Sequence, residues 1–157
     1  MRRRDREISS REEIDEIIRT ANVCRLALAR DCEPYLVPVS FGYDGRAIYF
    51  HTAKGGRKLD FIAANDRVCF ELEANVSIRT DDHDACKWTF AFESVIGYGR
   101  IHELENTEDK TDGLNQIMIH YSDHQWDIDA MATATTRVWR IEIESLTGKR
   151  SLEKPDS

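Results

Sequence analysis

Residues 51–58 of this 157-residue chain hold the side chains best suited to bind a phosphate group. A Gly-Gly pair stands directly before Arg57 and Lys58, and a run with helical spacing begins at Lys58. Backbone N–H groups at a helix start attract an anion, and basic side chains add charge-assisted hydrogen bonds. With the hydroxyl of Thr52 nearby, the segment predicts a phosphate-binding loop. The alternative is a solvated basic turn that only starts a helix.

His51 ends the β-type run that precedes this loop. It lies six and seven residues before Arg57 and Lys58, so all three side chains could face one phosphate or one ring edge. A lone histidine in an apolar strand is more often a structural residue than a ligand. We therefore treat His51 as a candidate cofactor contact and as a weak candidate for a catalytic role.

The elements around the loop are predominantly β. Residues 35–43 are almost wholly apolar, Asp44-Gly45 is typical of a hairpin turn, and residues 47–52 are again β-branched and aromatic. This pattern predicts a hairpin that ends at the loop. Pro38 lacks an N–H group, so the first strand cannot be fully paired inside a sheet.

The rest of the chain predicts further strands and short helices, without a strand–helix repeat. Strands are expected at 23–29, 67–74, 87–104 and 136–149. Residues 75–85 are expected to form a polar connection that can carry a short extended piece, and Gly97 and Gly99 to mark a bulge or a close backbone approach. A helix is expected at 9–22, with Ser10 and Glu13 as its capping box, and a second, short helix at 58–65. Thr107 is expected to cap a third helix, which buries Leu114, Ile117, Met118 and Tyr121. Residues 122–136 are expected to be irregular. About six strands in this order favour a mainly β, antiparallel barrel with peripheral helices.

Length and charge narrow the class of protein. The 157 residues predict a single domain, 1–157, with flexible tails at 1–8 and 151–157. A net charge of −7 argues against a nucleic-acid or anionic-membrane surface, and no apolar run reaches the length of a membrane span. No apolar stretch follows the basic N-terminus, and the four cysteines lack Cys-x-x-Cys spacing, so we expect reduced thiols in the cytoplasm.

Five motifs occur in an order that resembles a known family. They are PVSF at 38–41, YFH at 49–51, GRKLD at 56–60, CKW at 86–88 and SVIGYG at 94–99. Over roughly residues 10–150 the chain resembles the pyridoxamine 5'-phosphate oxidase-like flavoproteins, most closely their nitroimidazole-resistance (Nim-like) branch. The resemblance implies a six-stranded antiparallel split β-barrel that binds FMN across a homodimer interface.

The resemblance also implies site residues. It makes Lys58 a phosphate ligand, assisted by Arg57, and places His51 beside the flavin. The other implied flavin contacts are Val37, Pro38, Val39, Ser40, Thr52, Ser94, Val95, Trp139 and Arg140. Ser94 stands where the oxidases have a Gln, and Tyr35 near a position where they have an Arg. The missing Arg, together with the absence of a recognisable C-terminal substrate motif, counts against a true pyridoxamine-phosphate oxidase.

A dimer agrees with the apolar patterning. A small barrel is filled by its own side chains, so a flavin must lie outside it. Trp88, Phe90 and Phe92 alternate onto one face, as do Trp139, Ile141 and Ile143. Either face could meet a partner or the chain's own core. The resemblance favours the partner, with Trp139 or Arg140 reaching the partner's flavin.

These features predict an FMN-dependent oxidoreductase that reduces a nitro-aromatic or a similar small electrophile. Without a Rossmann fingerprint, NADH or NADPH would bind only transiently at the flavin. The alternative is a carrier or sensor that holds flavin or haem without turnover, with His51 as an axial ligand. Relatives of this fold also bind deazaflavin.

His120 and His124 have zinc-like i, i+4 spacing. Asp123 and Asp127 lie nearby, but no third strong ligand is evident. We therefore expect no metal site.

Overall fold

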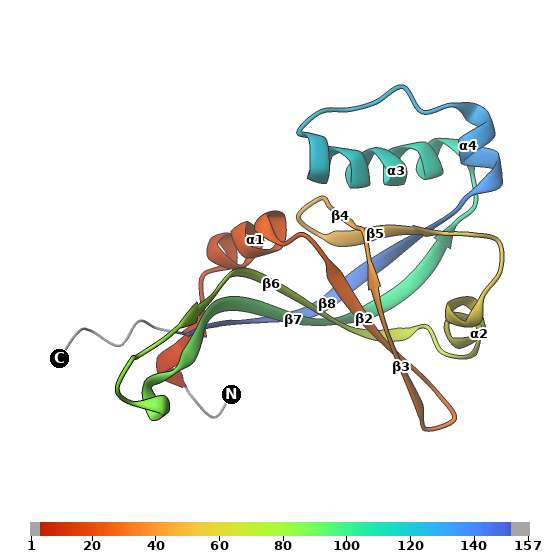
Figure 1. Ribbon diagram of the computed structural model, residues 1–157. Coiled ribbons are helices and arrows are strands. Elements are labelled where there is room, and N and C mark those ends of the chain that lie inside the picture. Colours follow the sequence, from red (N-terminus) through yellow and green to blue (C-terminus); the bar gives the residue numbers. More distant parts are fainter. Residues whose placement is uncertain (1–3, 152–157) are drawn as a thin grey trace.

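The computed structural model describes residues 4–151, and one antiparallel sheet dominates it (Figure 1). The strand order is β3-β2-β6-β7-β8-β5-β4, and β1 pairs with β8 outside this path. The strands are β1 Glu7–Ile8, β2 Cys24–Arg30, β3 Glu33–Val39, β4 Gly42–Tyr43, β5 Ala47–Thr52, β6 Arg67–Arg79, β7 Thr89–Leu104 and β8 Arg137–Arg150. The sheet path ends at β3 and at β4, so the barrel is open between these strands.

Four α-helices lie outside the sheet. They are α1 Arg11–Thr20, α2 Arg57–Ala64, α3 Thr107–Ser122 and α4 Ala130–Thr135, with single 3-10 turns at Arg4–Arg6 and Ala85–Lys87. Helix α3 packs over β4 and β5 (Figure 1). The prediction of a mainly β antiparallel barrel with peripheral helices is confirmed; β1 and β4, two residues each, are additional to the six expected strands. No helix within residues 4–151 is long and apolar enough to cross a membrane.

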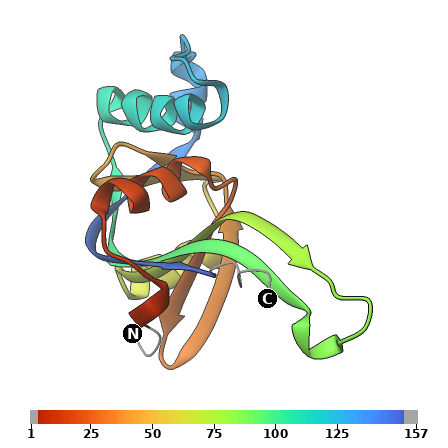
Figure 2. The ribbon, with the colours of Figure 1, turned by 90° about the vertical axis from the view of Figure 1, so that its left-hand side faces the viewer.

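The β6 and β7 strands extend beyond the barrel as a two-stranded arm, residues 75–92 (Figure 2). The connection expected at 75–85 has its extended piece in its first part, because β6 continues to Arg79 after a register shift between Ala74 and Ser77. Ile78 pairs with Phe90 across the arm, and both side chains are more than half exposed. The bulge expected near Gly97 and Gly99 is confirmed by a register shift between Tyr98 and Gly99.

The expected hairpin of residues 35–43 and 47–52 is only partly correct. Strand β3 pairs with β2, and only β4 pairs with β5. The first run breaks at Phe41, whose backbone N–H donates to the Tyr121 hydroxyl at 3.1 Å and whose side chain is fully buried. At Gly42 an added Cβ would lie 2.3 Å from the carbonyl carbon of Gln116, so only glycine lets the chain pass α3 there.

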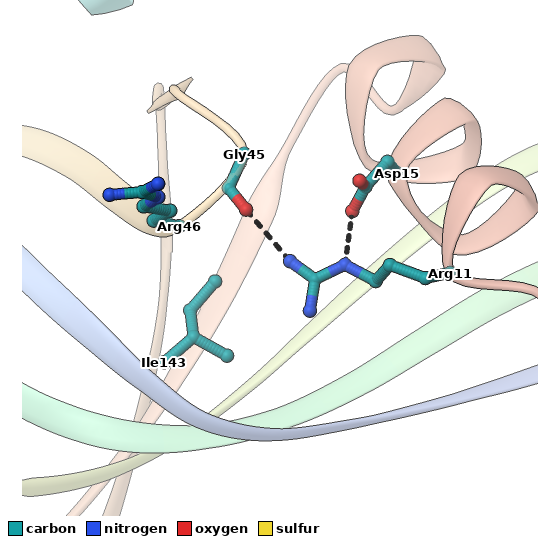
Figure 3. A pocket seen from close by; sticks show the side chains of 5 residues that line it. All are labelled: Arg11, Asp15, Gly45, Arg46 and Ile143. Atoms are coloured by element: carbon teal, nitrogen blue, oxygen red, sulfur yellow. Dashed lines mark hydrogen bonds and ion pairs between the residues drawn. The ribbon is translucent and has the colours of Figure 1, made fainter.

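Arg11 ties the β4–β5 turn to α1 (Figure 3). Its guanidinium donates to Asp15 at 2.7 Å, to the Tyr43 hydroxyl at 2.9 Å and to the Gly45 carbonyl at 2.8 Å. Tyr43 in turn donates to Asp15 at 2.6 Å. Burial, and then the bond to Asp15, raises the pKa of Tyr43 to about 12. A shallow pocket of about 370 Å³ lies beside this cluster. The side chains of Arg11 and Asp15, which line it, already form hydrogen bonds within the chain.

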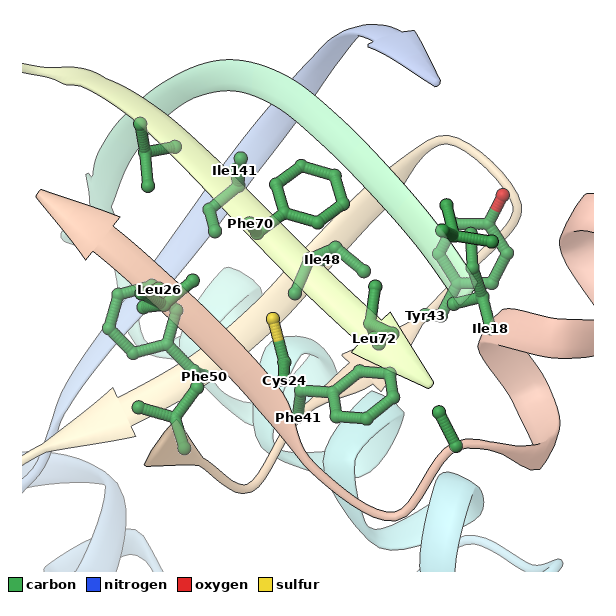
Figure 4. Close-up of a cluster of buried hydrophobic side chains, with 14 of the residues drawn as sticks. Ile18, Cys24, Leu26, Phe41, Tyr43, Ile48, Phe50, Phe70, Leu72 and Ile141 are labelled. Atoms are coloured by element: carbon green, nitrogen blue, oxygen red, sulfur yellow. The ribbon is translucent and has the colours of Figure 1, made fainter. Parts of the chain in front are cut away.

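The core lies inside the coiled sheet (Figure 4). Alternate positions of β2 face inward, which places Cys24 and Leu26 among fully buried aromatic side chains from other strands. These include Phe41, Phe50 and Phe70. Burial raises the pKa of the Cys24 thiol, so this cysteine is a core residue.

The ends of the described chain differ from the expected flexible tails. Strand β1 pairs with β8 and Ile8 is buried, so residues 4–8 are no flexible tail. The N–H of Ser151 donates to the Phe92 carbonyl at 2.8 Å; residues 1–3 and 152–157 lie outside the described part.

Helix α3 also corrects two expectations. Its N-cap is Asn106, not Thr107, because the Asn106 side chain accepts the Asp109 N–H. Ile117 is buried as expected, but Tyr121 is 45% exposed. The segment 122–136, expected to be irregular, contains α4.

Candidate functional site

A hollow of about 380 Å³ lies where the chain passes from β5 into α2. We call it the loop hollow; it is lined by Tyr35, His51, Thr52, Ala53, Gly55, Gly56, Arg57, Lys58 and Leu59. The predicted loop and helix start are confirmed, since α2 begins at Arg57. Gly56 precedes the helix with φ of 132°, a conformation that L side chains rarely adopt, and no side chain caps the helix. The first N–H groups of α2 thus lie at the hollow without a capping side chain.

Lys58 is a half-buried cation in this hollow. Its Nζ lies 5.8 Å from the centre of the Phe50 ring, and none of residues 4–151 provides it with a carboxylate partner. Burial lowers the pKa of Lys58. A half-buried ammonium group without a counter-ion favours the binding of an anion.

Arg57 is held differently from its neighbour. It forms an ion pair with Glu33, and its guanidinium lies 5.2 Å from the ring centre of Tyr35 and 5.6 Å from that of Phe61. Glu33 comes from the start of β3, so this ion pair links the β2–β3 turn to the loop. The two adjacent basic residues therefore differ in the structure: Lys58 has no ion-pair partner within residues 4–151, whereas Arg57 is already paired with Glu33.

Thr52 and Trp139 are bonded to each other. The indole Nε1–H of Trp139 donates to Thr52 Oγ1 at 3.0 Å, and both side chains are buried. Trp139 also stacks on Phe50, with ring centres 6.3 Å apart. Trp139 and Ile141 lie in the core of their own chain. Of the two residues expected to reach a partner's flavin, Trp139 or Arg140, only Arg140 keeps a partly exposed side chain, so the contact stays a prediction for Arg140.

Arg140 points away from the core beside Tyr49, its neighbour in the β5–β8 pairing. Its Nη1 donates to Glu142 at 3.3 Å, while its Nε is the one fully buried side-chain nitrogen or oxygen without a hydrogen-bond partner within residues 4–151. Arg140 does not line the loop hollow.

Strand β3 forms one free edge of the sheet and reaches the hollow at its third residue, Tyr35. The prediction that the Pro38 strand is not fully paired is confirmed. Pro38 and Ser40 are exposed, whereas Val39 is buried and Val37 packs against the core. The backbone of residues 37–40 is therefore the accessible part of this segment.

Ser94 and Val95 lie elsewhere. Val95 lies on β7 and its side chain is fully buried. It is linked to Val39 by successive strand pairings through Cys24 and Leu72, so three strand spacings separate the two residues. Three strand spacings are about 14 Å along the sheet. Within one chain, the structure groups His51, Thr52, Arg57 and Lys58, but does not bring Ser94, Val95, Trp139 or Arg140 to the same hollow.

His51 stands at the boundary between the loop hollow and a second, apolar hollow beneath α3 and α4. Although part of its ring is exposed, burial of the rest and then the Lys58 charge lower its pKa. His51 is therefore a neutral imidazole at pH 7, able to donate one hydrogen bond and accept another.

His120 and His124 hold the fold together. Nε2 of His120 is 2.8 Å from the Ala21 carbonyl oxygen, and its ring lies 4.1 Å from that of Phe41. His124 bonds the Ser122 carbonyl through Nδ1 at 2.7 Å and stacks on Trp126. Within residues 4–151, no group of three His, Cys, Asp or Glu side chains is placed to hold a metal ion.

Sequence reasoning missed two parts of the site. Tyr35 and Leu59 line the loop hollow without belonging to a charged or glycine-rich pattern. The Glu33–Arg57 ion pair joins residues 24 positions apart. In the sequence, this ion pair is indicated only by a charged residue, Glu33, at a turn. A single charged residue does not specify its partner.

The open antiparallel barrel with peripheral helices defines a split-barrel protein. The sequence profile of the pyridoxamine 5'-phosphate oxidase family matches residues 10–150, and the chain belongs to this family. A protein of Rhizobium meliloti (strain 1021), described as uncharacterised, is 30% identical over 113 residues. This match covers 72% of the chain but only 64% of that relative, less than two thirds of its length.

Two crystal structures extend the comparison. One is of a candidate 5-nitroimidazole antibiotic resistance protein from Bacteroides thetaiotaomicron, with 27% identity, 92% of this chain and 86% of that chain covered, and a TM-score of 0.81. The other is of an FAD-binding protein from Mesorhizobium loti, with 25% identity, 94% and 98% covered, and a TM-score of 0.68. Both support the resemblance drawn from the motifs.

Proposed function

We propose that the chain is a flavoprotein that binds FMN with its phosphate in the loop hollow. The half-buried ammonium of Lys58, without a counter-ion and next to the uncapped start of α2, is the observation that carries this proposal. An anion placed there would meet a cation and several backbone N–H groups. The Thr52 hydroxyl, which already accepts from Trp139, keeps its own hydrogen as a further donor.

The free edge of β3 suits the flavin ring in this proposal. It reaches the hollow at Tyr35 and offers unpaired backbone groups along residues 37–40, which could meet the polar edge of a heteroaromatic ring. FMN is favoured over FAD because the sequence has no second glycine-rich segment for an adenylate. The family and the flavin-binding name of the Mesorhizobium loti protein support a flavin.

The proposed activity is that of a flavin-dependent oxidoreductase acting on a small electrophile such as a nitro-aromatic, with NADH or NADPH as electron donor. The name of the Bacteroides thetaiotaomicron relative supports this substrate class. FMN supplies the electron transfer when bound. The chain's own residues bind the phosphate, orient the ring and shield it from water, in a cytoplasmic protein whose four cysteines are unpaired.

We propose further that the active unit is a homodimer with FMN at the interface. Ser94 does not line the loop hollow of its own chain, so in this proposal its implied flavin contact is made to the flavin of a second copy. The arm carries apolar side chains that its own chain leaves open, with Trp88 54%, Phe90 53% and Ile78 62% exposed. Large exposed apolar side chains grouped in this way mark an interaction surface.

The visible spectrum of the purified protein tests the proposed function. A flavin double band is expected, and chromatography of the chromophore released by denaturation should give FMN. A Soret band, FAD, or a colourless protein that does not take up FMN would refute the cofactor assignment. Oxidation of NADH or NADPH by the holoprotein in the presence of a nitro-aromatic then separates an enzyme from a flavin carrier.

A further inference from the structure

The second hollow, beneath α3 and α4, has a different chemical character from the loop hollow. Its volume is about 310 Å³, and we call it the α3–α4 hollow. Its apolar walls come from α3 and from the segment that follows α3, and His51 of β5 also lines it. The side chains that matter for the argument are Leu114, Ile117, Met118, Trp126, Ile128 and His51.

Helix α3 is held close to the sheet on one side of this hollow. At Gly113 an added Cβ would lie 2.9 Å from Cγ1 of Val138 and 3.0 Å from Cδ1 of Leu104, so glycine permits this approach. The C-terminal end of α3 is fastened by the Tyr121 hydroxyl, which donates to the Asn22 carbonyl at 2.9 Å. The walls supplied by α3 are therefore fixed to the barrel.

Trp126 also lines the hollow and is held in place. Its backbone N–H donates to the Asn115 side chain at 2.8 Å, and its indole N–H donates to the Ser122 hydroxyl at 2.9 Å. His124 stacks on its ring, and 49% of the Trp126 surface nevertheless remains exposed. A tryptophan with both donors satisfied and part of its ring exposed is suited to contact with a flat apolar molecule.

The polar groups of the hollow restrict the charge of a ligand. His51 makes no hydrogen bond to any residue between 4 and 151, so its ring nitrogens remain available at the hollow. Asp127 is the charged residue of the lining, and no Lys or Arg contributes to it. A carboxylate ligand would lose its water here without gaining a cation. An uncharged ligand with one polar group near His51 meets no such penalty.

We propose that the α3–α4 hollow binds a neutral, planar aromatic compound of one or two rings, with a polar substituent directed at His51. Its volume is at the lower end of the range for ligand pockets, about 300–1,000 Å³. Because His51 also lines the loop hollow, this site adjoins the proposed FMN phosphate site. The identification of the bound compound as the electron-accepting substrate rests on the proposed function. The binding of the compound to the hollow does not depend on it.

Calorimetric titration of the purified full-length protein with nitrobenzene and with benzoate tests this proposal. The two probes have nearly the same shape, but only nitrobenzene is uncharged. Nitrobenzene is expected to bind at least about tenfold more tightly than benzoate, because ionic groups are costly to bury unpaired. Equal affinities for the two probes would overturn the proposal. So would no binding of nitrobenzene, which is also the result expected if a second copy of the chain fills the hollow.

Two variants of α4 locate the binding site. Ala132→Phe adds a ring at an exposed position that lines the hollow, while Ala134→Phe makes the same change at an exposed position of the same helix that does not. The first should weaken nitrobenzene binding at least about tenfold, and the second less than about twofold. Equal effects would place the probe elsewhere and refute the site.

FMN binding, measured on the same variants, separates the two proposals. Both Ala132→Phe and Ala134→Phe should bind FMN as the wild type does, because neither residue lines the loop hollow. If no flavin binds to any form but the nitrobenzene results hold, the proposed function fails and the aromatic site stands. If FMN binds but nitrobenzene does not, only the aromatic site fails.

Discussion

The indole Nε1–H of Trp139 donates a hydrogen bond to Oγ1 of Thr52, with 3.0 Å between the two atoms, and both residues are buried. This bond joins the core to the loop hollow. Thr52 is the last residue of β5 and also lines the hollow. The bond fixes the orientation of the hydroxyl, so the remaining hydroxyl hydrogen is the one a ligand can use. Trp139 thereby positions a candidate phosphate contact without touching the phosphate itself.

Replacement of Thr52 tests this relationship through stability. Thr52→Val keeps the shape of the side chain but leaves the buried indole N–H without an acceptor, which should cost about 1–3 kcal/mol in the free energy of unfolding. Thr52→Ser retains the hydroxyl and should lose less. Urea unfolding of the three proteins measures the difference. Equal losses for the two variants would show that the hydrogen bond contributes nothing measurable.

The Glu33–Arg57 ion pair predicts a gain in affinity. Glu33→Gln should free Arg57 for the phosphate and remove a nearby negative charge, so FMN should bind more tightly. Since both side chains are largely exposed, the expected gain is small, about two- to fivefold. Fluorescence titration with FMN measures it, and riboflavin, which has no phosphate, should bind both proteins equally. Weaker FMN binding by Glu33→Gln would contradict this role of Glu33.

His120 predicts a loss of stability in mild acid. Its burial lowers the pKa of the imidazole in the folded chain, so below about pH 6.5 the unfolded chain binds the proton more readily. The free energy of unfolding should therefore decrease as the pH falls from about 7 to about 5. His120→Gln keeps a donor for the Ala21 carbonyl but does not titrate. Its stability should decrease less over this range, and parallel curves for the two proteins would exclude His120 as the source.

The arm predicts coupling between assembly and cofactor binding. Phe90→Glu places a charge on the exposed apolar face of the arm and should shift a homodimer toward monomer at low protein concentration. If FMN lies at the interface, the same variant should bind FMN more weakly, although Phe90 does not line the loop hollow. Light scattering and FMN titration at matched concentrations test both effects. A wild-type monomer that retains FMN tightly would refute the interface.

Local patterns predicted the site better than long-range contacts. The Gly-Gly pair followed by two basic residues and an apolar helical run is contained in ten residues, so the loop and α2 could be recognised from the sequence. The break at Phe41 could not, because it depends on the Tyr121 hydroxyl from 80 positions away. Likewise, the alternation of Trp139, Ile141 and Ile143 identified one face of a strand but left open whether that face meets a partner or the chain's own core, where the structure places Trp139.

The comparison of FMN with riboflavin in Lys58→Ala tests the central claim most directly. A charge-assisted hydrogen bond to phosphate contributes about 1.5–3 kcal/mol, so the variant should bind FMN about ten- to a hundredfold more weakly than the wild type. Riboflavin should bind both proteins with nearly the same affinity. This result would place the flavin phosphate at Lys58. Equal losses for FMN and riboflavin, or no loss for FMN, would contradict the assignment of the loop hollow as the phosphate site.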